Sequence, residues 1–324
     1  MMFIISFLCY NMYCLEGIMF KEYYLKVLNY DNVPEFLKKY LEVPTLQRLK
    51  EIGYFCGMDF ASKKIYEFKE YISRYDHSLT VALLVYKLTE NKEATIAGLF
   101  HDISTPCFSH VIDYMNKDYE KQESTEKNMF KVIESDPTLL NLLREDKIKV
   151  DQIVNFKDFT IVDNDRPKLC ADRLDGVIHT SYNWTKELKL EEIDTIINDI
   201  KIFKNEYEEY ELGFKTKEVA ERLLELSDSI NVICHSSEDN YMMELLAKIT
   251  RYSINKGYIT YDELFLSTEK LIFEKFDKQD DNFLKTMLKE FRTIGPESIP
   301  YIELPNVKTR NINPILKGKR LKED

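Results

Sequence analysis

Past residue 30, apolar residues recur mostly every three or four positions, which is the spacing of one face of an α-helix. In the segment 78–90 this stripe consists of Val81, Leu84, Val85 and Leu88. The next segment, 93–101, is short and apolar on every side, as expected for a helix in the centre of a domain. Glycine and proline number only nine each, so few residues interrupt long helices.

The same periodicity predicts helices along most of the chain. They cover 33–40, 45–53, 108–115, 120–135, 139–144, 168–182, 191–206, 215–234, 239–256, 261–276 and 280–291. Short strands fit only 185–190, 258–260 and 301–304. We therefore predict an all-α fold with one multi-helix domain over 19–295, at most minor short strands, and an irregular C-terminal tail over 296–324.

Composition narrows the class of protein. Of the 324 residues, 44% are hydrophobic and 31% are charged, which is typical of a soluble globular domain. The net charge of −11 argues against a broad face for nucleic acid. A small anionic substrate remains compatible with it, because a metal ion and a few cations can dominate one pocket. The six cysteines form no CxxC pair, which favours reduced thiols and a cytoplasmic location.

Residues 1–18 form an apolar N-terminal extension. The segment lacks a cationic start and a small-residue cleavage site, and it is too short to cross a bilayer, so we predict no transmembrane span. A more ordinary amphipathic sequence begins at Met19. We interpret the extension as the result of a start codon assigned too far upstream, and the alternative is a short membrane-associating segment.

The histidines carry the candidate chemistry. Only five occur, and three of them fall between 77 and 110. The adjacent pair His101-Asp102 at the end of an apolar helical run offers a nitrogen and an oxygen ligand to the same point. His77 on a preceding helix and an aspartate of the later cluster 171–175 would complete a two-His, two-Asp metal site. This mixed set suits Mn, Fe, Co, Ni or Zn and leaves positions for water or a phosphate oxygen, which predicts a metal-dependent phosphohydrolase.

Four strings carry a resemblance to a known family. They are Arg74-Tyr75-Asp76-His77-Ser78, Ala97-Gly98-Leu99-Phe100-His101-Asp102-Ile103, Phe108-Ser109-His110 and Ala171-Asp172-Arg173-Leu174-Asp175. In order and spacing they resemble the HD-domain superfamily of metal phosphohydrolases, a helical fold. The flanking residues are similar to the deoxynucleoside triphosphate triphosphohydrolase branch, which includes bacterial dGTP triphosphohydrolases and the vertebrate SAM- and HD-domain enzyme. The resemblance covers roughly residues 45–185.

The resemblance implies a role for each matching residue. The implied ligands of a divalent metal ion (Mn, Fe, Co, Ni, Zn or Mg) are His77, His101, Asp102 and Asp172. Asp175, three residues beyond Asp172, is the alternative ligand or an orienting residue. Arg74 and Arg173 match positions that bind phosphate oxygens. His110, Asp113 and Glu123 match positions near the attacked phosphorus, while their structural alternatives are a packed histidine and two solvated carboxylates.

The chain also departs from the family pattern. Thr105 and Gln122 occupy positions where the family has histidines, so the chain has fewer residues that could transfer a proton. Gly176 and Thr180 replace a tyrosine and an aspartate that the nucleotide-hydrolysing branch uses on the sugar. We therefore predict weak discrimination between ribose and deoxyribose.

Two classes of function follow from these residues. The leading hypothesis is an enzyme in which a metal-activated water attacks the phosphorus of a nucleotide or a related small phosphorylated metabolite. The alternative is a nucleotide-binding regulatory protein that retains the metal with little or no turnover. A third interpretation is an interaction scaffold built on the C-terminal helices. The resemblance is compatible with a homo-oligomer, although nothing in the residues requires one.

Overall fold

A computed structural model describes residues 19–120, 128–302, 304 and 307–322, and the predictions for residues 1–18 and Glu123 lie outside this part. Within it the chain forms sixteen α-helices and only short strands, so the prediction of a mostly helical fold is confirmed. The helices of the first part of the chain are α2 (Phe20–Val27), α3 (Glu35–Leu41), α4 (Pro44–Arg48), α5 (Arg74–Thr89), α6 (Lys92–Phe100), α7 (Val111–Asn116), α8 (Met129–Glu134), α9 (Pro137–Glu145), α10 (Val150–Val154) and α11 (Ala171–Asn183).

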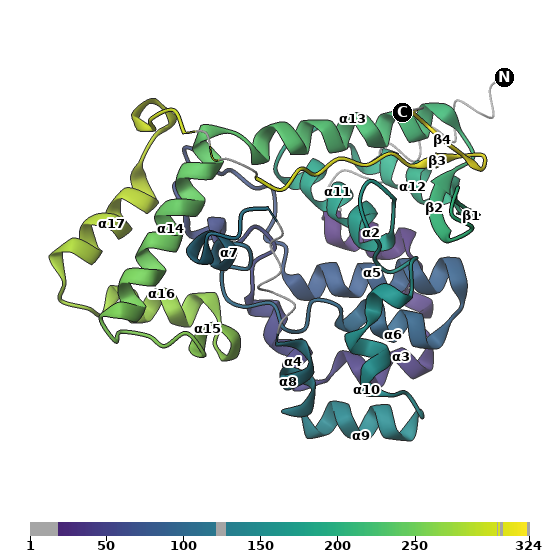
Figure 1. Ribbon diagram of the computed structural model, residues 1–324, viewed down its shortest axis with the longest axis horizontal. Helices are drawn as coiled ribbons and strands as arrows, with labels where there is room; N and C mark the ends of the chain where they lie inside the picture. Colours follow the sequence, from purple (N-terminus) through teal and green to yellow (C-terminus); the bar gives the residue numbers. More distant parts are fainter. Residues whose placement is uncertain (1–18, 121–127, 303, 305–306, 323–324) are drawn as a thin grey trace.

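The remaining helices are α12 (Leu190–Asp199), α13 (Lys217–Cys234), α14 (Ser237–Asn255), α15 (Glu263–Leu266), α16 (Glu269–Asp277) and α17 (Asn282–Thr293). The strands are β1 (Ile200–Lys204), β2 (Tyr210–Phe214), β3 (Ile315–Leu316) and β4 (Lys319–Arg320). Figure 1 shows α5 and α6 surrounded by the other helices, with the strands at one end of α13. No helix in the described residues is long and apolar enough to cross a membrane.

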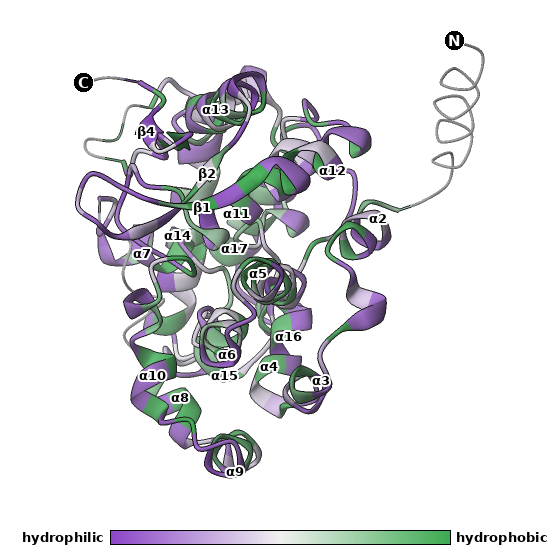
Figure 2. Ribbon diagram, turned by 90° about the vertical axis from the view of Figure 1, so that its right-hand side faces the viewer, coloured by the Kyte–Doolittle hydropathy of each residue, from purple (hydrophilic) through white to green (hydrophobic). Residues whose placement is uncertain are grey.

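Helix α5 forms the centre of the domain, and Figure 2 shows it end-on between the surrounding helices. Its N-terminus is fixed by a capping box, in which the Ser73 hydroxyl accepts from the backbone N–H of Asp76 (3.1 Å) and the Asp76 carboxylate accepts from the backbone N–H of Ser73 (2.8 Å). This cap starts the helix at Arg74, four residues before the predicted start. His77 therefore lies within the first turn of α5.

Helix α6 packs against α5 and ends directly before the His-Asp pair. Asn91 caps its N-terminus by accepting from the backbone N–H of Ala94 (2.9 Å). All residues from Ala94 to Phe100 are buried, as the apolar sequence predicts. A Cβ on Gly98 would lie 3.5 Å from the Val81 side chain, which is ordinary van der Waals contact, so the packing of the two helices does not require a glycine there.

The predicted positions of the strands were wrong. The segments 185–189 and 258–260 are irregular, and Leu190 already begins α12. Of the predicted strand 301–304, the described residues 301, 302 and 304 lie in no strand. Within the predicted helix 191–206, residues 200–204 form strand β1. β1 pairs antiparallel with β2, and Ile200 lies opposite Phe214. The change occurs because Ile200–Lys204 finds a hydrogen-bonding partner in the following strand, which outweighs the local helical spacing.

The C-terminal tail crosses the domain and joins the sheet. In Figure 1 the tail runs beside α13 to β3 and β4, and β3 pairs parallel with β2. Ile312 and Ile315 are buried, and the Asn313 backbone N–H donates to the Pro167 carbonyl (2.8 Å). The tail thereby packs against the loop that precedes α11.

Candidate metal centre

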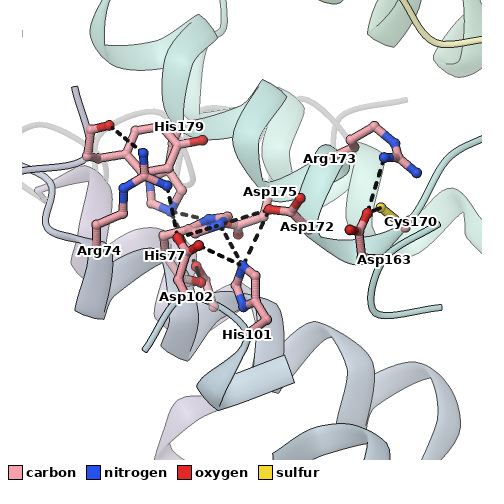
Figure 3. A network of polar contacts seen from close by, with 12 residues as sticks. Arg74, His77, His101, Asp102, Asp163, Cys170, Asp172, Arg173, Asp175 and His179 are labelled. Atoms are coloured by element: carbon pink, nitrogen blue, oxygen red, sulfur yellow. Dashed lines mark hydrogen bonds and ion pairs between the residues drawn. The ribbon is translucent and has the colours of Figure 1, made fainter. Parts of the chain in front are cut away.

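Three helices bring the four predicted ligand residues together. His77 lies in the first turn of α5, and Asp172 is the second residue of α11. His101 and Asp102 directly follow α6. Figure 3 shows the four side chains turned toward one another where these helices meet.

The inward atoms of three of these residues have the spacing of metal ligands. His77 Nε2 lies 2.9 Å from Asp172 Oδ1 and 3.2 Å from His101 Nε2. His101 Nε2 lies 3.5 Å from Asp172 Oδ1. Ligand atoms at about 2.0–2.2 Å from one transition-metal ion are roughly 3 Å apart. His77, His101 and Asp172 therefore fit a single divalent ion.

Asp102 borders this group at a longer distance. Asp102 Oδ2 lies 3.9 Å from His77 Nε2, and Asp102 Oδ1 lies 3.9 Å from His101 Nε2. Arg74 Nη1 donates to Asp102 Oδ2 at 2.9 Å, and the guanidinium also covers the ring of Tyr54. The Arg74 charge is thus placed beside the centre through Asp102.

The opposite nitrogen of each histidine is also bound, which orients Nε2 toward the centre. His101 Nδ1 lies 2.7 Å from the Gly98 carbonyl, so Nδ1 is the protonated donor. His77 Nδ1 lies 2.7 Å from Asp175 Oδ2. Hydrogen bonds of this kind fix the tautomer of a metal-binding histidine and raise its basicity.

The charges of the cluster compensate one another. Burial would lower the pKa of His77, but the hydrogen bonds with Asp172 and Asp175 outweigh it and raise the pKa to about 10. Burial would raise the pKa of Asp172, whereas the contacts with His101 and His77 hold it well below its usual range. Without an ion, the two imidazoles therefore tend to be protonated, and a bound divalent cation would supply the positive charge in place of those protons.

Asp175 belongs to the layer behind the ligands. It is completely buried, accepts from the Tyr24 hydroxyl (2.8 Å), and contacts His179 Nε2 (3.1 Å). His77, Asp175 and His179 also have ligand-like spacing, but Asp175 and His179 are buried and do not line the pocket. The geometry favours Asp172 as the ligand and Asp175 as the residue that orients His77.

We expect Asp175→Asn to weaken metal binding about 10–100-fold, which is the usual cost of losing such an outer partner. The reason is that an amide carries no charge to hold the Nδ1 proton of His77. Titration of the metal-free chain with Mn²⁺, followed by calorimetry, measures the effect.

Asp151→Asn is the matched control, because Asp151 is exposed on α10. It is expected to bind Mn²⁺ like the unchanged chain. If Asp175→Asn folds normally and retains the full affinity, Asp175 has no orienting role.

His110 and Asp113 lie on one short segment near the centre. His110 immediately precedes α7, and its Nδ1 lies 2.9 Å from Asp113 Oδ2. Asp113 is completely buried, so it is not the solvated carboxylate of the structural alternative. Burial lowers the pKa of His110 despite the opposing contact with Asp113. The imidazole is therefore neutral near pH 7, with Nε2 as the proton acceptor.

The turn before His110 is held by distant residues. Phe108 and Ser109 adopt positive φ angles of 68° and 45°, a conformation that is costly for residues other than glycine. The Phe108 backbone N–H donates to the buried Glu269 carboxylate (3.0 Å), and the Cys107 N–H donates to the Leu264 carbonyl (2.7 Å). Residues of α15 and α16 thus fix the position of His110.

Arg173 lies apart from the four-residue cluster. Figure 3 shows its guanidinium beside Asp163, and Nη1 lies 3.2 Å from Asp163 Oδ1. Its Nε donates to the Lys168 carbonyl (2.8 Å) and Nη2 to the Asn164 carbonyl (2.6 Å). The side chain lines the pocket with its donors already engaged.

A pocket of about 720 Å³ opens from the cluster. His77, His101, Asp102, Asp172 and His110 line one part of it. Another part is aromatic and contains Phe55, Tyr66, Phe68 and Trp184. A volume of 300–1,000 Å³ is usual for small-molecule sites, so the pocket can hold a molecule of nucleotide size next to the cluster.

Comparisons with known proteins agree with this geometry. The uncharacterized protein YdhJ of Bacillus subtilis is 26% identical over 245 residues, which cover 73% of this chain and 69% of that protein. The metal-dependent phosphohydrolase cns2 of Cordyceps militaris is 25% identical over 158 residues, or 49% of this chain and 42% of the fungal protein. Residues 74–176 match the HD domain model. The segment 74–176 is therefore similar to an HD domain.

The HD domain spans the four predicted ligands, His110 and Asp113. HD domains bind divalent metals, and the cluster described above could hold such an ion. The match begins at Arg74 and ends at Gly176, so it leaves out Tyr54 and the C-terminal tail.

Several pocket residues outside the recognised strings were missed by sequence reasoning, and four polar ones stand out. They are Tyr54, Arg166, Asp239 and Arg310. Tyr54 lies beside His77, and its hydroxyl is 2.9 Å from where a Cβ of Gly176 would stand. Only the Arg310-Asn311-Ile312-Asn313-Pro314 string gave a signal, as a vague likeness to a string in some HD proteins, and it suggested no mechanism. The other three lacked a local pattern because the fold alone brings them to the pocket.

Proposed function

We propose that the chain is a metal-dependent phosphohydrolase that acts on a nucleotide or a related small phosphorylated metabolite. The observation that carries the proposal is the joining of the His77, His101 and Asp172 cluster to a large, partly aromatic pocket. The HD domain and the relation to a protein named as a metal-dependent phosphohydrolase support the hydrolase class. The aromatic wall, in which Phe55 and Phe68 stack at 4.1 Å, offers apolar surface to a planar base.

In this proposal the ion is held by His77, His101 and Asp172, with Asp102 as the fourth ligand after a small movement. A bound divalent ion supplies Lewis-acid polarisation of a phosphoryl oxygen and a lowered pKa of water. Arg74 places positive charge beside the phosphoryl group, and Arg173 adds to the positive potential of the pocket wall. His110 accepts a proton from the attacking water at Nε2, while Asp113 holds its Nδ1–H. We also propose that Glu123 takes part near the attacked phosphorus.

The deoxynucleoside triphosphate branch is the finer proposal, and the quoted strings support it. Thr105 is nearly fully buried, and its carbonyl accepts from Arg48. Thr105 is not among the residues that line the pocket, so its side chain does not replace the missing histidine. This observation favours the alternative function, a nucleotide-binding regulatory HD protein with little turnover.

A release assay separates the two functions. Purified chain is incubated with Mn²⁺, Mg²⁺, Co²⁺, Ni²⁺ or Fe²⁺ and a panel of nucleotides, and phosphate, pyrophosphate and triphosphate are measured. Release of one of these products, dependent on the metal and lost on chelation, supports the enzyme. Tight nucleotide binding without release supports the regulatory protein.

We expect weak selection between ribonucleotides and deoxyribonucleotides. Gly176 and Thr180 offer no large polar side chain to the sugar, and a site rejects an analogue strongly only when it is built to bond the differing hydroxyl. The ratio of kcat/KM for a dNTP and its NTP should stay within about tenfold on this reasoning.

Steady-state kinetics on matched NTP and dNTP pairs measures the ratio. The same ratio is measured for the variant Tyr54→Phe, which lacks the hydroxyl group next to Gly176. A strong preference for dNTPs in the unchanged chain contradicts the prediction.

A further inference from the structure

The C-terminal tail brings a second arginine to the pocket. Arg310 precedes Ile312, which is buried, and Arg166 lies in the loop before α11. Both side chains line the same pocket as the proposed ligands. Neither residue belongs to the metal cluster or to the recognised strings that surround it.

The backbone of Arg310 is fixed on both sides. Its N–H donates to Asn231 Oδ1 (2.7 Å), and its carbonyl accepts from the Ser227 hydroxyl (3.0 Å). Both partners lie on α13. The tail therefore presents the Arg310 side chain from an anchored position, which reduces the entropy lost when a ligand binds.

The two arginines differ from the other arginines of the pocket in their partners. Arg74 is paired with Asp102, and Arg173 is paired with Asp163. Within the described residues, no carboxylate lies at ion-pair distance from Arg166 or Arg310. The Arg310 guanidinium interacts with the Cys234 thiol, while its Nε is buried without a hydrogen-bond partner. The nearby Asp239 is bound by the Tyr66 hydroxyl instead (2.6 Å).

The charge of Arg166 is poorly compensated within the described residues. Burial, followed by the charges of Arg310 and Arg173, lowers the pKa of Arg166 to about 10. Carboxylates also line the pocket, but those of Asp163, Asp172 and Asp239 contact other groups. Two half-buried guanidinium groups without a carboxylate are a preorganised site for phosphate oxygens, because guanidinium donors bind them in pairs.

We propose that Arg166 and Arg310 form an anion subsite that binds a second phosphoryl group of the substrate, apart from the group at the metal centre. The inference rests on the proposed function, since it places one phosphoryl group at the ion. It narrows the substrate class to molecules with at least two phosphoryl groups, such as a phosphoanhydride chain or a bisphosphate. A monoester of a neutral alcohol leaves the subsite unfilled.

Binding to the metal-free chain tests the subsite without catalysis. Inorganic pyrophosphate is titrated into the full chain in chelator by calorimetry. Arg310→Gln and Arg166→Gln should each weaken binding at least about tenfold, because each removes charge-assisted hydrogen bonds. Arg310→Lys should retain part of the affinity. Arg144→Gln, at an exposed arginine on α9, has the same change of charge and should bind like the unchanged chain.

Kinetics then identifies the second group. With the metal-loaded chain, Arg310→Gln should raise KM for the preferred multiply phosphorylated substrate and leave KM for p-nitrophenyl phosphate unchanged. Comparison of a nucleoside diphosphate with a nucleoside 3′,5′-bisphosphate distinguishes an anhydride chain from a separate phosphate.

The two proposals fail in different ways. If no substrate is turned over, the proposed function is wrong, and pyrophosphate binding still decides the subsite. If both glutamine variants bind pyrophosphate like Arg144→Gln, the subsite is wrong even where hydrolysis is observed. Circular dichroism of each variant shows whether the fold is retained.

Discussion

Asp172→Ala is expected to empty the metal centre and to abolish hydrolysis. Asp172 Oδ1 lies 2.9 Å and 3.5 Å from the inward nitrogens of His77 and His101, so its loss removes the anionic ligand in direct contact with both and leaves only Asp102, whose oxygens lie 3.9 Å away. Elemental analysis should find close to one transition-metal ion per unchanged chain and almost none in the variant. Turnover should fall at least about 10³-fold, because Lewis-acid stabilisation contributes several kcal/mol.

Two comparisons make this test specific. Asp194→Ala removes an exposed aspartate from α12, outside the pocket, and should retain both metal and activity. The double variant His101→Ala with Asp102→Ala should behave like Asp172→Ala. If freshly purified chain contains no metal and takes up neither Mn²⁺ nor Fe²⁺ on titration, the metal centre itself is refuted.

His110→Ala is expected to lower turnover about 10²–10⁴-fold, the usual contribution of a general acid–base group. Metal content should remain near that of the unchanged chain, because His110 is not among the proposed ligands. Asp113→Asn should have a smaller effect of the same kind, since Asp113 holds His110 Nδ1. Measurement of kcat, KM and metal content on the same preparations separates a catalytic role from a coordinating one.

The pH profile gives a second test of His110. Burial lowers the pKa of this imidazole below its ordinary 6.5, so the neutral, proton-accepting form is present at pH 7. As pH falls through the lowered pKa, the imidazole gains a proton and activity should decline. This acidic limb should disappear in the residual activity of His110→Ala. A variant with near-normal turnover would falsify the catalytic role and leave His110 as a packed residue.

Much of the fold followed from local pattern. The stripe in α5 and the uniformly apolar α6 were predicted because the positions that are buried in a helix are occupied by apolar residues, so their spacing can be recognised in the sequence. The predicted start of α5 was four residues too late, because Ser73 and Asp76 form the cap and the helix begins at Arg74. The hairpin of β1 and β2 was missed, because strand pairing depends on a partner that lies elsewhere in the chain.

The candidate site divides in the same way. His101 and Asp102 are adjacent in sequence and follow a buried helix, so their shared direction could be inferred from the chain alone. The choice of Asp172 over Asp175 as a proposed ligand rested on resemblance, and the structure supports it through the contact of Asp175 with His77 Nδ1. The HD domain match covers this part of the site.

What the sequence determined by itself is therefore the helical class, which is encoded by short-range spacing. It also supplied the proposed metal ligands, through rare residue types and the resemblance of the strings that contain them. The tertiary structure decided which groups surround them. Arg173 is engaged by Asp163, whereas Arg166 and Arg310 meet in the pocket although 144 positions separate them in the chain. The physical reason is that charge compensation depends on distance in space, and residues far apart in sequence come within reach of one another only when the tail packs against the domain.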